Sequence, residues 1–219
     1  MTGRREFLGK LGVSAAAAMA FDADELHAAS ATRSRSDGPW DTSWLDRLAA
    51  AKYKVVFNGN EMNDGEVLDY ANTFLVHYRE VHGTSDKDTR PVIVFRRLGP
   101  TLALNDAMWD RYALGEGSKV TDPATHAPAR RNIYWPVTQP AEEPSSTIES
   151  LHRRGMISLV CNVAVGNVGR RLAGQFKREV AEVQQELRAN LVPGAILVPS
   201  GIYALIRAQN AGCAWMPGT

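Results

Sequence analysis

Hydrophobic residues along this chain fall into two patterns, short continuous runs and longer stretches with helical spacing. The runs at residues 54–57 and 91–95 are typical of buried strands. Between them, apolar positions recur every three or four residues over 64–83, which predicts a helix with an acidic start and a glycine stop. The same spacing predicts a further helix over 104–115.

The carboxyl-terminal half continues this alternation. Ser146-Thr147-Ile148-Glu149 is a capping box that opens a helix leading to Gly155. Hydrophobic runs then predict strands over 156–161, 195–198 and 213–216, and helical spacings lie between them over 163–171, 175–190 and 201–212. Because strands and helices alternate throughout, we expect an α/β fold with a parallel sheet covered by helices on both faces.

The first 31 residues differ from the rest and predict an export signal. Arg4 and Arg5 precede a short alanine-rich apolar run over 11–21, and small residues follow near Ala29. Paired arginines in this context are typical of the twin-arginine pathway, which moves proteins that are already folded. We therefore expect a signal peptide over 1–31 and a periplasmic or otherwise exported product.

The remaining chain is expected to form one domain with two additions. Residues 32–53 are predicted to be a leader and a short docking helix that contains Trp44, and residues 54–219 the α/β domain. Residues 116–144 hold five of the eleven prolines, and a loop of that length is normally functional or disordered. The sequence Asn132-Ile133-Tyr134-Trp135 favours an ordered arm that packs on its own domain or on a neighbouring subunit.

Charge and composition argue against several classes of function. Lys and Arg number 25 against 24 Asp and Glu, and 22 against 20 without residues 1–31, which gives no electrostatic case for nucleic acid. No other stretch approaches about 18 apolar residues, so stable membrane insertion is not expected. The histidines lack metal-ligand spacing, and no glycine-rich phosphate loop is present, so neither a metal nor a cofactor is predicted.

Cys161 is the residue that most suggests chemistry. It ends a predicted buried strand and precedes a helix, and open α/β sheets bind ligands at that edge. The positive end of a helix favours the thiolate, which is the nucleophilic form of cysteine. A cysteine that ends a core strand is also often just a small buried hydrophobic residue, so both interpretations stay open.

Polar residues follow the other predicted strands and could share a crevice with Cys161. The asparagines could orient a small polar ligand, and an arginine could stabilise a thiolate or persulfide. The candidates for ligand binding are Asn58, Asn60, Arg96, Arg97, Asn162 and Ser200. Each also has a structural alternative: the asparagines of the first loop as turn residues, the serine as a helix N-cap, and the arginines as solvated side chains.

The second cysteine, Cys213, is not expected to pair with Cys161. Cys161 ends its strand whereas Cys213 begins another, so in a parallel sheet they lie toward opposite edges. A disulfide tolerates Cα atoms no more than about 7 Å apart, so we expect the geometry to exclude this bridge. Two cysteines also do not make a disulfide framework.

The order of these pieces resembles the DsrE/DsrF-like family over residues 54–216. The likeness rests on the first strand with its polar loop, Arg154-Gly155 followed by Cys161, the turn Pro199-Ser200-Gly201, and a last helix that ends at Gly212. The resemblance implies a three-layer α/β/α fold with about five parallel strands and assembly as a homotrimer or hexamer. The chain resembles in particular an exported branch of that family. Two features depart from the family pattern. The known sulfur relays work in the cytoplasm, and the insertion at 116–144 is not part of the minimal fold.

The resemblance leaves several functions open. It also leaves open whether the protein is an enzyme. Well-understood family members pass sulfane sulfur along cysteine persulfides, which implies a sulfur carrier that acts through Cys161 with a donor or acceptor protein as partner. The alternative is a non-catalytic, oligomeric module that binds a ligand or partner, favoured if the Cys161 sulfur is buried. A thiol-disulfide oxidoreductase ranks last, because the chain has no CxxC motif.

Overall fold

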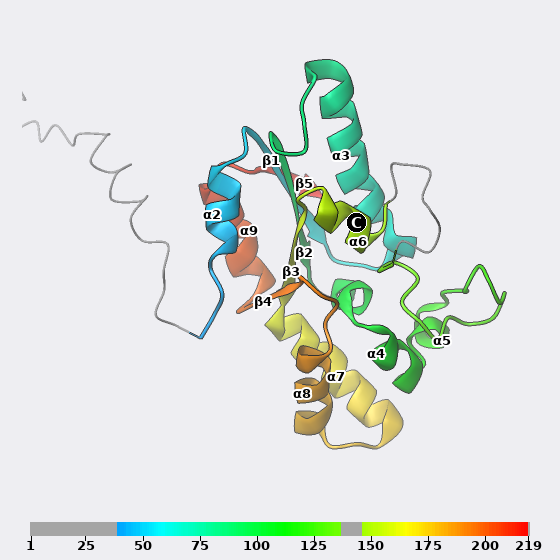
Figure 1. The fold of residues 1–219 in the computed structure, drawn as a ribbon. Coiled ribbons are helices and arrows are strands. Elements are labelled where there is room, and N and C mark those ends of the chain that lie inside the picture. The colour runs from blue at the N-terminus through cyan, green and yellow to red at the C-terminus, as the bar shows by residue number, and fades with distance from the viewer. Residues whose placement is uncertain (1–38, 137–145, 219) are drawn as a thin grey trace, which may run out of the picture. The chain divides into compact units, whose positions relative to one another are not determined.

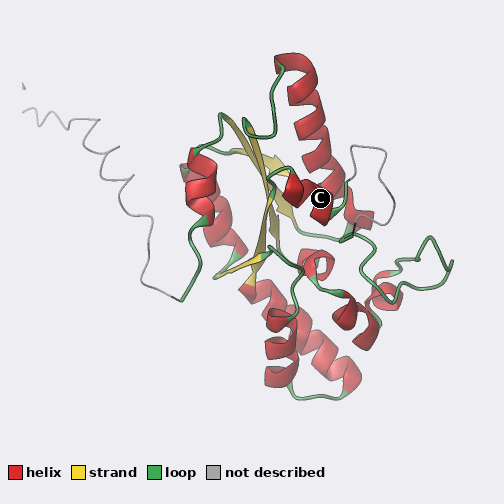
Figure 2. Ribbon diagram, viewed as in Figure 1, coloured by secondary structure: helices red, strands yellow, loops and turns green. Residues whose placement is uncertain are grey.

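The computed structural model describes residues 39–136 and 146–218, and this part of the chain is built around one parallel sheet (Figure 1). Its strands pair in the order β4-β3-β2-β1-β5. They are β1 (Tyr53–Gly59), β2 (Thr89–Phe95), β3 (Ile157–Cys161), β4 (Ile196–Val198) and β5 (Ala214–Pro217). Helices lie on both faces, so the predicted three-layer α/β/α architecture is confirmed (Figure 2). The predicted signal peptide and residues 137–144 of the insertion lie outside the described residues.

Two helices cover one face of the sheet, α2 (Trp44–Ala49) and α9 (Gly201–Asn210). Trp44 and Leu48 of α2 are fully buried there against β2 and β3 residues such as Val92 and Leu159. The docking helix predicted around Trp44 is therefore present, because its two large apolar side chains lie four residues apart on one helix face.

The opposite face carries the remaining helices and the larger core. They are η1 (Asn63–Gly65), α3 (Glu66–His82), η2 (Gly99–Ala103), α4 (Asp106–Arg111), α5 (Leu114–Ser118), α6 (Ile148–Arg153), α7 (Asn162–Phe176) and α8 (Val180–Ala189). Successive strand residues point to opposite faces, so Val55 and Phe57 of β1 join this core whereas Val56 joins the other.

Helix α3 follows the predicted pattern closely. Acidic residues in its first turn, Glu66 and Asp69, complement the helix dipole. Its buried stripe contains Val67, Ala71 and Leu75. The helix ends where Gly83 takes a left-handed conformation with φ of 63°, which glycine adopts without strain.

Two helix boundaries differ from the sequence-based expectation. The helix predicted to begin at residue 175 begins at Val180, because α7 continues to Phe176 and ends where Lys177 turns left-handed with φ of 52°. The helix predicted over 104–115 is divided into α4 and α5, with Ala113 left-handed between them. Non-glycine residues with positive φ carry little sequence signal, which is why both breaks were missed.

The described part of the insertion is held against its own domain. Asn132 is fully buried, and its side-chain amide donates to the carbonyl oxygens of Leu102 and Leu104, each at 2.7 Å. Its side-chain oxygen accepts the backbone N–H of Tyr134 at 2.8 Å. Tyr134 is thereby buried, with its ring 6.0 Å from that of Trp109. The arm therefore buries this aromatic ring without a neighbouring subunit.

Among the helices in residues 39–136 and 146–218, none combines the length and apolar character needed to cross a membrane. Helices α3, α7 and α9 place their apolar side chains in the two cores beside the sheet.

Candidate functional site

Three of the predicted site residues lie on one face at the carboxyl edge of the sheet. Asn58, Arg96 and Cys161 come at or just after the ends of β1, β2 and β3. Alternation along the strands directs all three toward the α9 side, since their neighbours Phe57, Phe95 and Val160 pack in the opposite core. The parallel pairing of β1, β2 and β3 makes these residues neighbours across the sheet.

Arg96 links this group to the start of α9. Its Nη1 lies 3.5 Å from the side-chain oxygen of Asn58, a long hydrogen bond. Its aliphatic stem packs against Gly201, where an added Cβ would lie 3.1 Å from Arg96 Cβ and Cδ. Gly201 therefore permits close contact between the arginine and the first turn of α9. Ser200 precedes this turn, and its Oγ accepts the Tyr203 N–H at 3.1 Å, so its structural alternative as an N-cap is present.

Cys161 lies at the predicted position but is buried. It is 5 % exposed, and its Sγ accepts the backbone N–H of Ala164 at 3.3 Å, which makes it the N-cap of α7. The sulfur therefore serves the helix terminus directly. A buried Cys161 sulfur favours the alternative function, a non-catalytic binding module, over a sulfur carrier, which needs an accessible thiol.

The other predicted site residues do not join this group. Arg97 is exposed, and its Nε donates to Glu61 at 3.1 Å. Asn162 accepts a 2.6 Å hydrogen bond from Arg188 and so ties α7 to α8. Asn60 acts through its backbone carbonyl, which accepts the N–H groups of Leu98 and Gly99 and shapes the loop after β2.

Cys213 is also buried and is not paired with Cys161. Burial raises the pKa of its thiol to about 11, and the nearby Lys54 only partly offsets this. In the sheet, β3 and β5 are separated by β2 and β1. The prediction that these cysteines form no disulfide is therefore confirmed in this structure.

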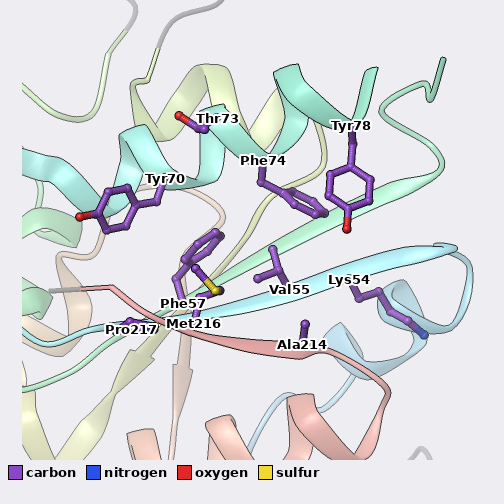
Figure 3. Close-up of a pocket in the computed structure, with 10 residues that line it drawn as sticks. All are labelled: Lys54, Val55, Phe57, Tyr70, Thr73, Phe74, Tyr78, Ala214, Met216 and Pro217. Atoms are coloured by element: carbon purple, nitrogen blue, oxygen red, sulfur yellow. The ribbon is translucent and has the colours of Figure 1, made fainter. Parts of the chain in front are cut away.

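A concave site that sequence reasoning missed lies on the α3 face of the sheet (Figure 3). This groove has a volume of about 650 Å³, within the range of small-molecule sites. Strand β1 and helix α3 form two of its walls, and β5 forms the third. The lining residues are Lys54, Val55, Phe57, Tyr70, Thr73, Phe74, Tyr78, Ala214, Met216 and Pro217.

The groove exists because β5 is an edge strand that α3 does not cover. Helix α3 packs on β1 and β2, whereas all four residues of β5 are exposed. Val55 pairs with Ala214, and Phe57 with Met216, so the β5 side chains continue the apolar surface of β1 outward. In the part of the chain that the structure describes, this apolar wall therefore has no covering helix.

Aromatic rings from α3 form the roof of the groove. Figure 3 shows Phe74 and Tyr78 directed from the helix toward the strands. Their ring centroids lie 4.6 Å apart, and Tyr78 lies 4.9 Å from Tyr53 of β1. Positions 70, 74 and 78 are spaced by four residues beside the buried stripe of α3, and this widened apolar face is the signal that the sequence carried.

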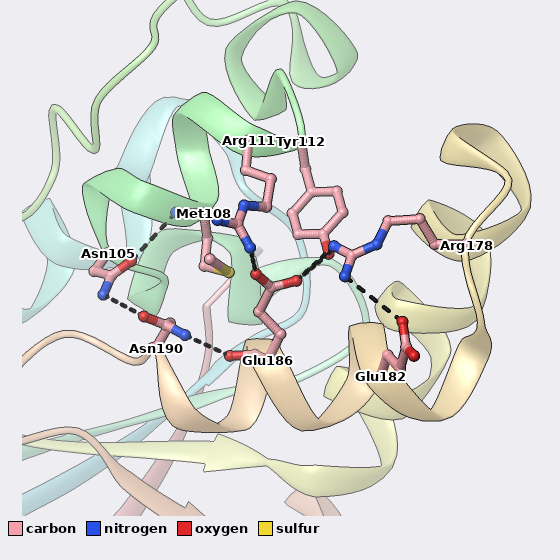
Figure 4. A network of polar contacts seen from close by, with 8 residues as sticks. All are labelled: Asn105, Met108, Arg111, Tyr112, Arg178, Glu182, Glu186 and Asn190. Carbon is pink, nitrogen blue, oxygen red and sulfur yellow. Dashed lines mark hydrogen bonds and ion pairs between the residues drawn. The ribbon is translucent and has the colours of Figure 1, made fainter.

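A polar network elsewhere in the fold is structural (Figure 4). Glu186 of α8 contacts Arg111 and Tyr112, and its carboxylate accepts a 2.8 Å hydrogen bond from Arg178. Arg178 also donates to the Tyr112 hydroxyl at 2.7 Å. The carboxylate is satisfied within the network, which joins α8 to the end of α4.

The partly buried His152 forms a polar pair with the fully buried Ser158. The His152 Nε2 lies 2.8 Å from Ser158 Oγ, and Ser158 has no exposed surface. Burial and the positive charge of Arg47 lower the pKa of His152 to about 4, so it is neutral at pH 7. Because the hydroxyl is sealed from solvent, this pair joins α6 to β3 and offers no accessible nucleophile.

Within the described ranges, no cluster of three or more His, Cys, Asp or Glu residues is placed to hold a metal ion. Comparison with known proteins adds little. No protein-family profile and no curated protein matches the chain. Among solved structures, the chain resembles a protein of unknown function, MTH1491 from Methanobacterium thermoautotrophicum, with a TM-score of 0.39 and 16% identity. That match covers 75% of this chain and 98% of the other.

Proposed function

We propose that this protein is a binding protein that takes a small, largely apolar ligand in the groove between α3, β1 and β5. The observation that carries the proposal is the contrast between two sites. The groove is lined by apolar and aromatic side chains, whereas Cys161 is buried and its sulfur caps a helix. Concave apolar sites with a few polar groups are the usual form of small-molecule sites.

The groove offers binding surface rather than catalytic groups. Its polar members are Lys54, Thr73 and two tyrosines, Tyr70 and Tyr78. The Tyr70 hydroxyl donates to Glu66 at 2.5 Å, and this hydrogen bond raises the tyrosine pKa. A tyrosine held protonated in this way does not serve as a general base at neutral pH. These groups support a binding role.

The experiment is titration of the full chain with the neutral fluorescent probe N-phenyl-1-naphthylamine, whose emission rises in apolar sites. Thr73 is exposed on α3 and lines the groove, whereas Val81 is exposed on the same helix outside it. We expect Thr73→Trp to weaken probe binding roughly tenfold, because the indole occupies apolar surface needed by the ligand. The matched Val81→Trp variant should bind as the parent does. Absence of saturable binding, or equal effects of the two variants, would refute the proposal.

Sulfur carriage through Cys161 is a second candidate, which one specific contact favours. The Ala164 N–H directed at Sγ would stabilise a thiolate or persulfide at the α7 N-terminus. In the transfer, the Cys161 thiolate attacks the outer sulfur of a protonated donor persulfide, the donor S–S bond breaks, the proton stays on the transferred sulfur, and the donor leaves as a thiolate. The first turn of α7 would have to open to admit the donor, because Cys161 is buried.

Export and self-assembly belong to the same proposal. The paired arginines Arg4 and Arg5 support export through the twin-arginine pathway. Assembly as a homotrimer or hexamer rests on the DsrE/DsrF-like resemblance, and the exposed edge strand β5 offers a surface for it. Light scattering at micromolar concentration tests assembly, and a monodisperse monomer would contradict it.

A further inference from the structure

We infer that the ligand of this groove is an uncharged aromatic compound whose polar group, a hydroxyl or a carbonyl, forms a hydrogen bond with the hydroxyl of Tyr78. This inference rests on the proposed function, because it names the chemical class of the ligand in the same groove. Three features of the groove support it: a row of aromatic rings, the placement of its charged side chain outside the cavity, and a tyrosine hydroxyl that the protein does not use.

Aromatic side chains line the groove from two elements. Phe57 comes from β1, with its ring centroid 6.4 Å from that of Tyr70 on α3. Phe74 and Tyr78 continue the row along the helix, with centroids 4.6 Å apart. Aromatic rings gain from offset or edge-to-face contact with other rings, and a saturated chain does not offer this contact. These walls therefore favour an aromatic ligand body over an aliphatic one.

The apolar strand surface sets the size of that body. Val55 and Phe57 of β1 lie beside Ala214 and Met216 of β5. From Val55 to Phe57 the strand advances two residues, or about 7 Å at roughly 3.3 Å per residue, which is close to the length of two fused aromatic rings. A body of the size of naphthalene therefore matches this surface.

The groove provides no counter-charge for an ionised ligand. Of its ten lining residues, only Lys54 has a charged side chain. Along β1 it alternates with Val55 and Phe57, which face the α3 side, and its ammonium lies by Gly212 on the opposite face of the sheet. An ionised ligand group would therefore lose hydration in the groove without gaining a partner, which favours a neutral ligand.

Tyr78 supplies the hydrogen-bonding group. Its ring is held by three neighbours, with centroids 4.9 Å from Tyr53, 4.6 Å from Phe74 and 5.3 Å from His82. Its hydroxyl has no hydrogen-bond partner in the described part of the chain, and Figure 3 shows it directed from α3 toward the strands. Because the ring is already fixed, this hydroxyl can bind a ligand oxygen at a low cost in side-chain entropy.

The other hydroxyl groups of the groove are less suited to this role. The Tyr70 hydroxyl already donates its proton to Glu66 at 2.5 Å. Thr73 is exposed, and Figure 3 shows its hydroxyl directed away from the strands. The ligand's polar group is therefore expected at Tyr78, with the rest of its ring body extending toward Phe57.

The test is competition of three compounds against N-phenyl-1-naphthylamine on the full chain. Naphthalene, 2-naphthol and 2-naphthoate share one ring body and carry no polar group, a neutral hydroxyl and an ionised carboxylate at pH 7. We expect 2-naphthoate to bind about tenfold more weakly than 2-naphthol, because its charge is desolvated without a partner.

Two variants isolate the hydrogen bond. Tyr78→Phe keeps the ring and removes the hydroxyl, so it should weaken 2-naphthol binding about fivefold and leave naphthalene binding unchanged. Tyr53→Phe removes a hydroxyl from a ring that packs on Tyr78 but does not line the groove, so it should change neither affinity.

The outcomes separate this inference from the proposed function. Equal binding of 2-naphthol and 2-naphthoate would overturn the uncharged ligand while the apolar binding site stands. A Tyr78→Phe variant that affects 2-naphthol and naphthalene alike, or no more than Tyr53→Phe does, would overturn the role of the hydroxyl in the same way. Failure of the fluorescent probe itself to bind would overturn both proposals.

Discussion

The sulfur of Cys161 accepts a hydrogen bond from the backbone N–H of Ala164 at 3.3 Å, and this contact closes the first turn of α7. A cysteine at the end of a buried strand is thus used as a helix cap. The same contact would stabilise a thiolate, so the capping and chemical roles of this residue are distinguished by accessibility rather than by position.

Replacing Cys161 tests its structural role. Cys161→Ala removes the acceptor for the Ala164 N–H, so we expect a loss of about 1 kcal/mol in the free energy of unfolding. Cys161→Ser retains an oxygen acceptor and should restore part of that loss. Urea denaturation of the three proteins measures the difference. Equal stability of the alanine and serine variants would show that the cap contributes nothing.

Sulfur loading tests the chemical role of the same residue. If Cys161 is a sulfur carrier, exposure of the folded protein to glutathione persulfide should add one sulfur atom to Cys161 and none to Cys213, because burial raises the pKa of the Cys213 thiol to about 11. Peptide mass analysis locates the added sulfur, with Cys161→Ala and Cys213→Ala as matched controls. Equal loading of both cysteines would indicate nonspecific thiol chemistry.

His152 should make stability depend on pH in a defined window. Its pKa is about 4 in the folded protein and about 6.5 when unfolded, so between these values only the unfolded chain binds the proton. Stability should therefore fall by roughly 3 kcal/mol as the pH drops from 6.5 to 4, and this contribution should level off below pH 4. Denaturation across this range, compared with His152→Gln, measures it. An unchanged slope in the variant would show that other groups are responsible.

Glu186 should be more important to stability than surface acids. Glu186→Ala leaves Arg111, Tyr112 and Arg178 without their shared acceptor, so we expect a loss of about 2 kcal/mol. Glu61 pairs with the exposed Arg97, and Glu61→Ala should cost about 0.5 kcal/mol or less. Thermal or chemical unfolding compares the variants. Similar losses at both positions would contradict a structural role for the network.

Export depends on the paired arginines if the signal is of the twin-arginine type. Replacing Arg4 and Arg5 by lysine should leave precursor in the cytoplasm, because that pathway requires the arginine pair. Cell fractionation with immunoblotting follows the precursor and the processed form. Unchanged appearance of the processed protein outside the cytoplasm would refute the assignment.

Local sequence determined the alternation of strands and helices, since hydrophobic periodicity is a property of neighbouring residues. It placed Cys161 at the boundary of β3 and α7, and it anticipated the N-cap at Ser200 and the glycine end of α3. Each of these features depends on groups within about one helical turn. They could therefore be predicted without knowledge of the fold.

Tertiary structure decided which of these residues meet. Arg96 reaches Asn58 and the start of α9, whereas Arg97, one residue later, is exposed in the loop after β2, where its backbone takes a left-handed φ of 53°. The groove depended on strand order in the same way. By pairing with β1 at the sheet edge, β5 left the apolar side chains of β1 and α3 without a cover. Strand order is fixed by contacts between segments distant in sequence, which local periodicity does not encode.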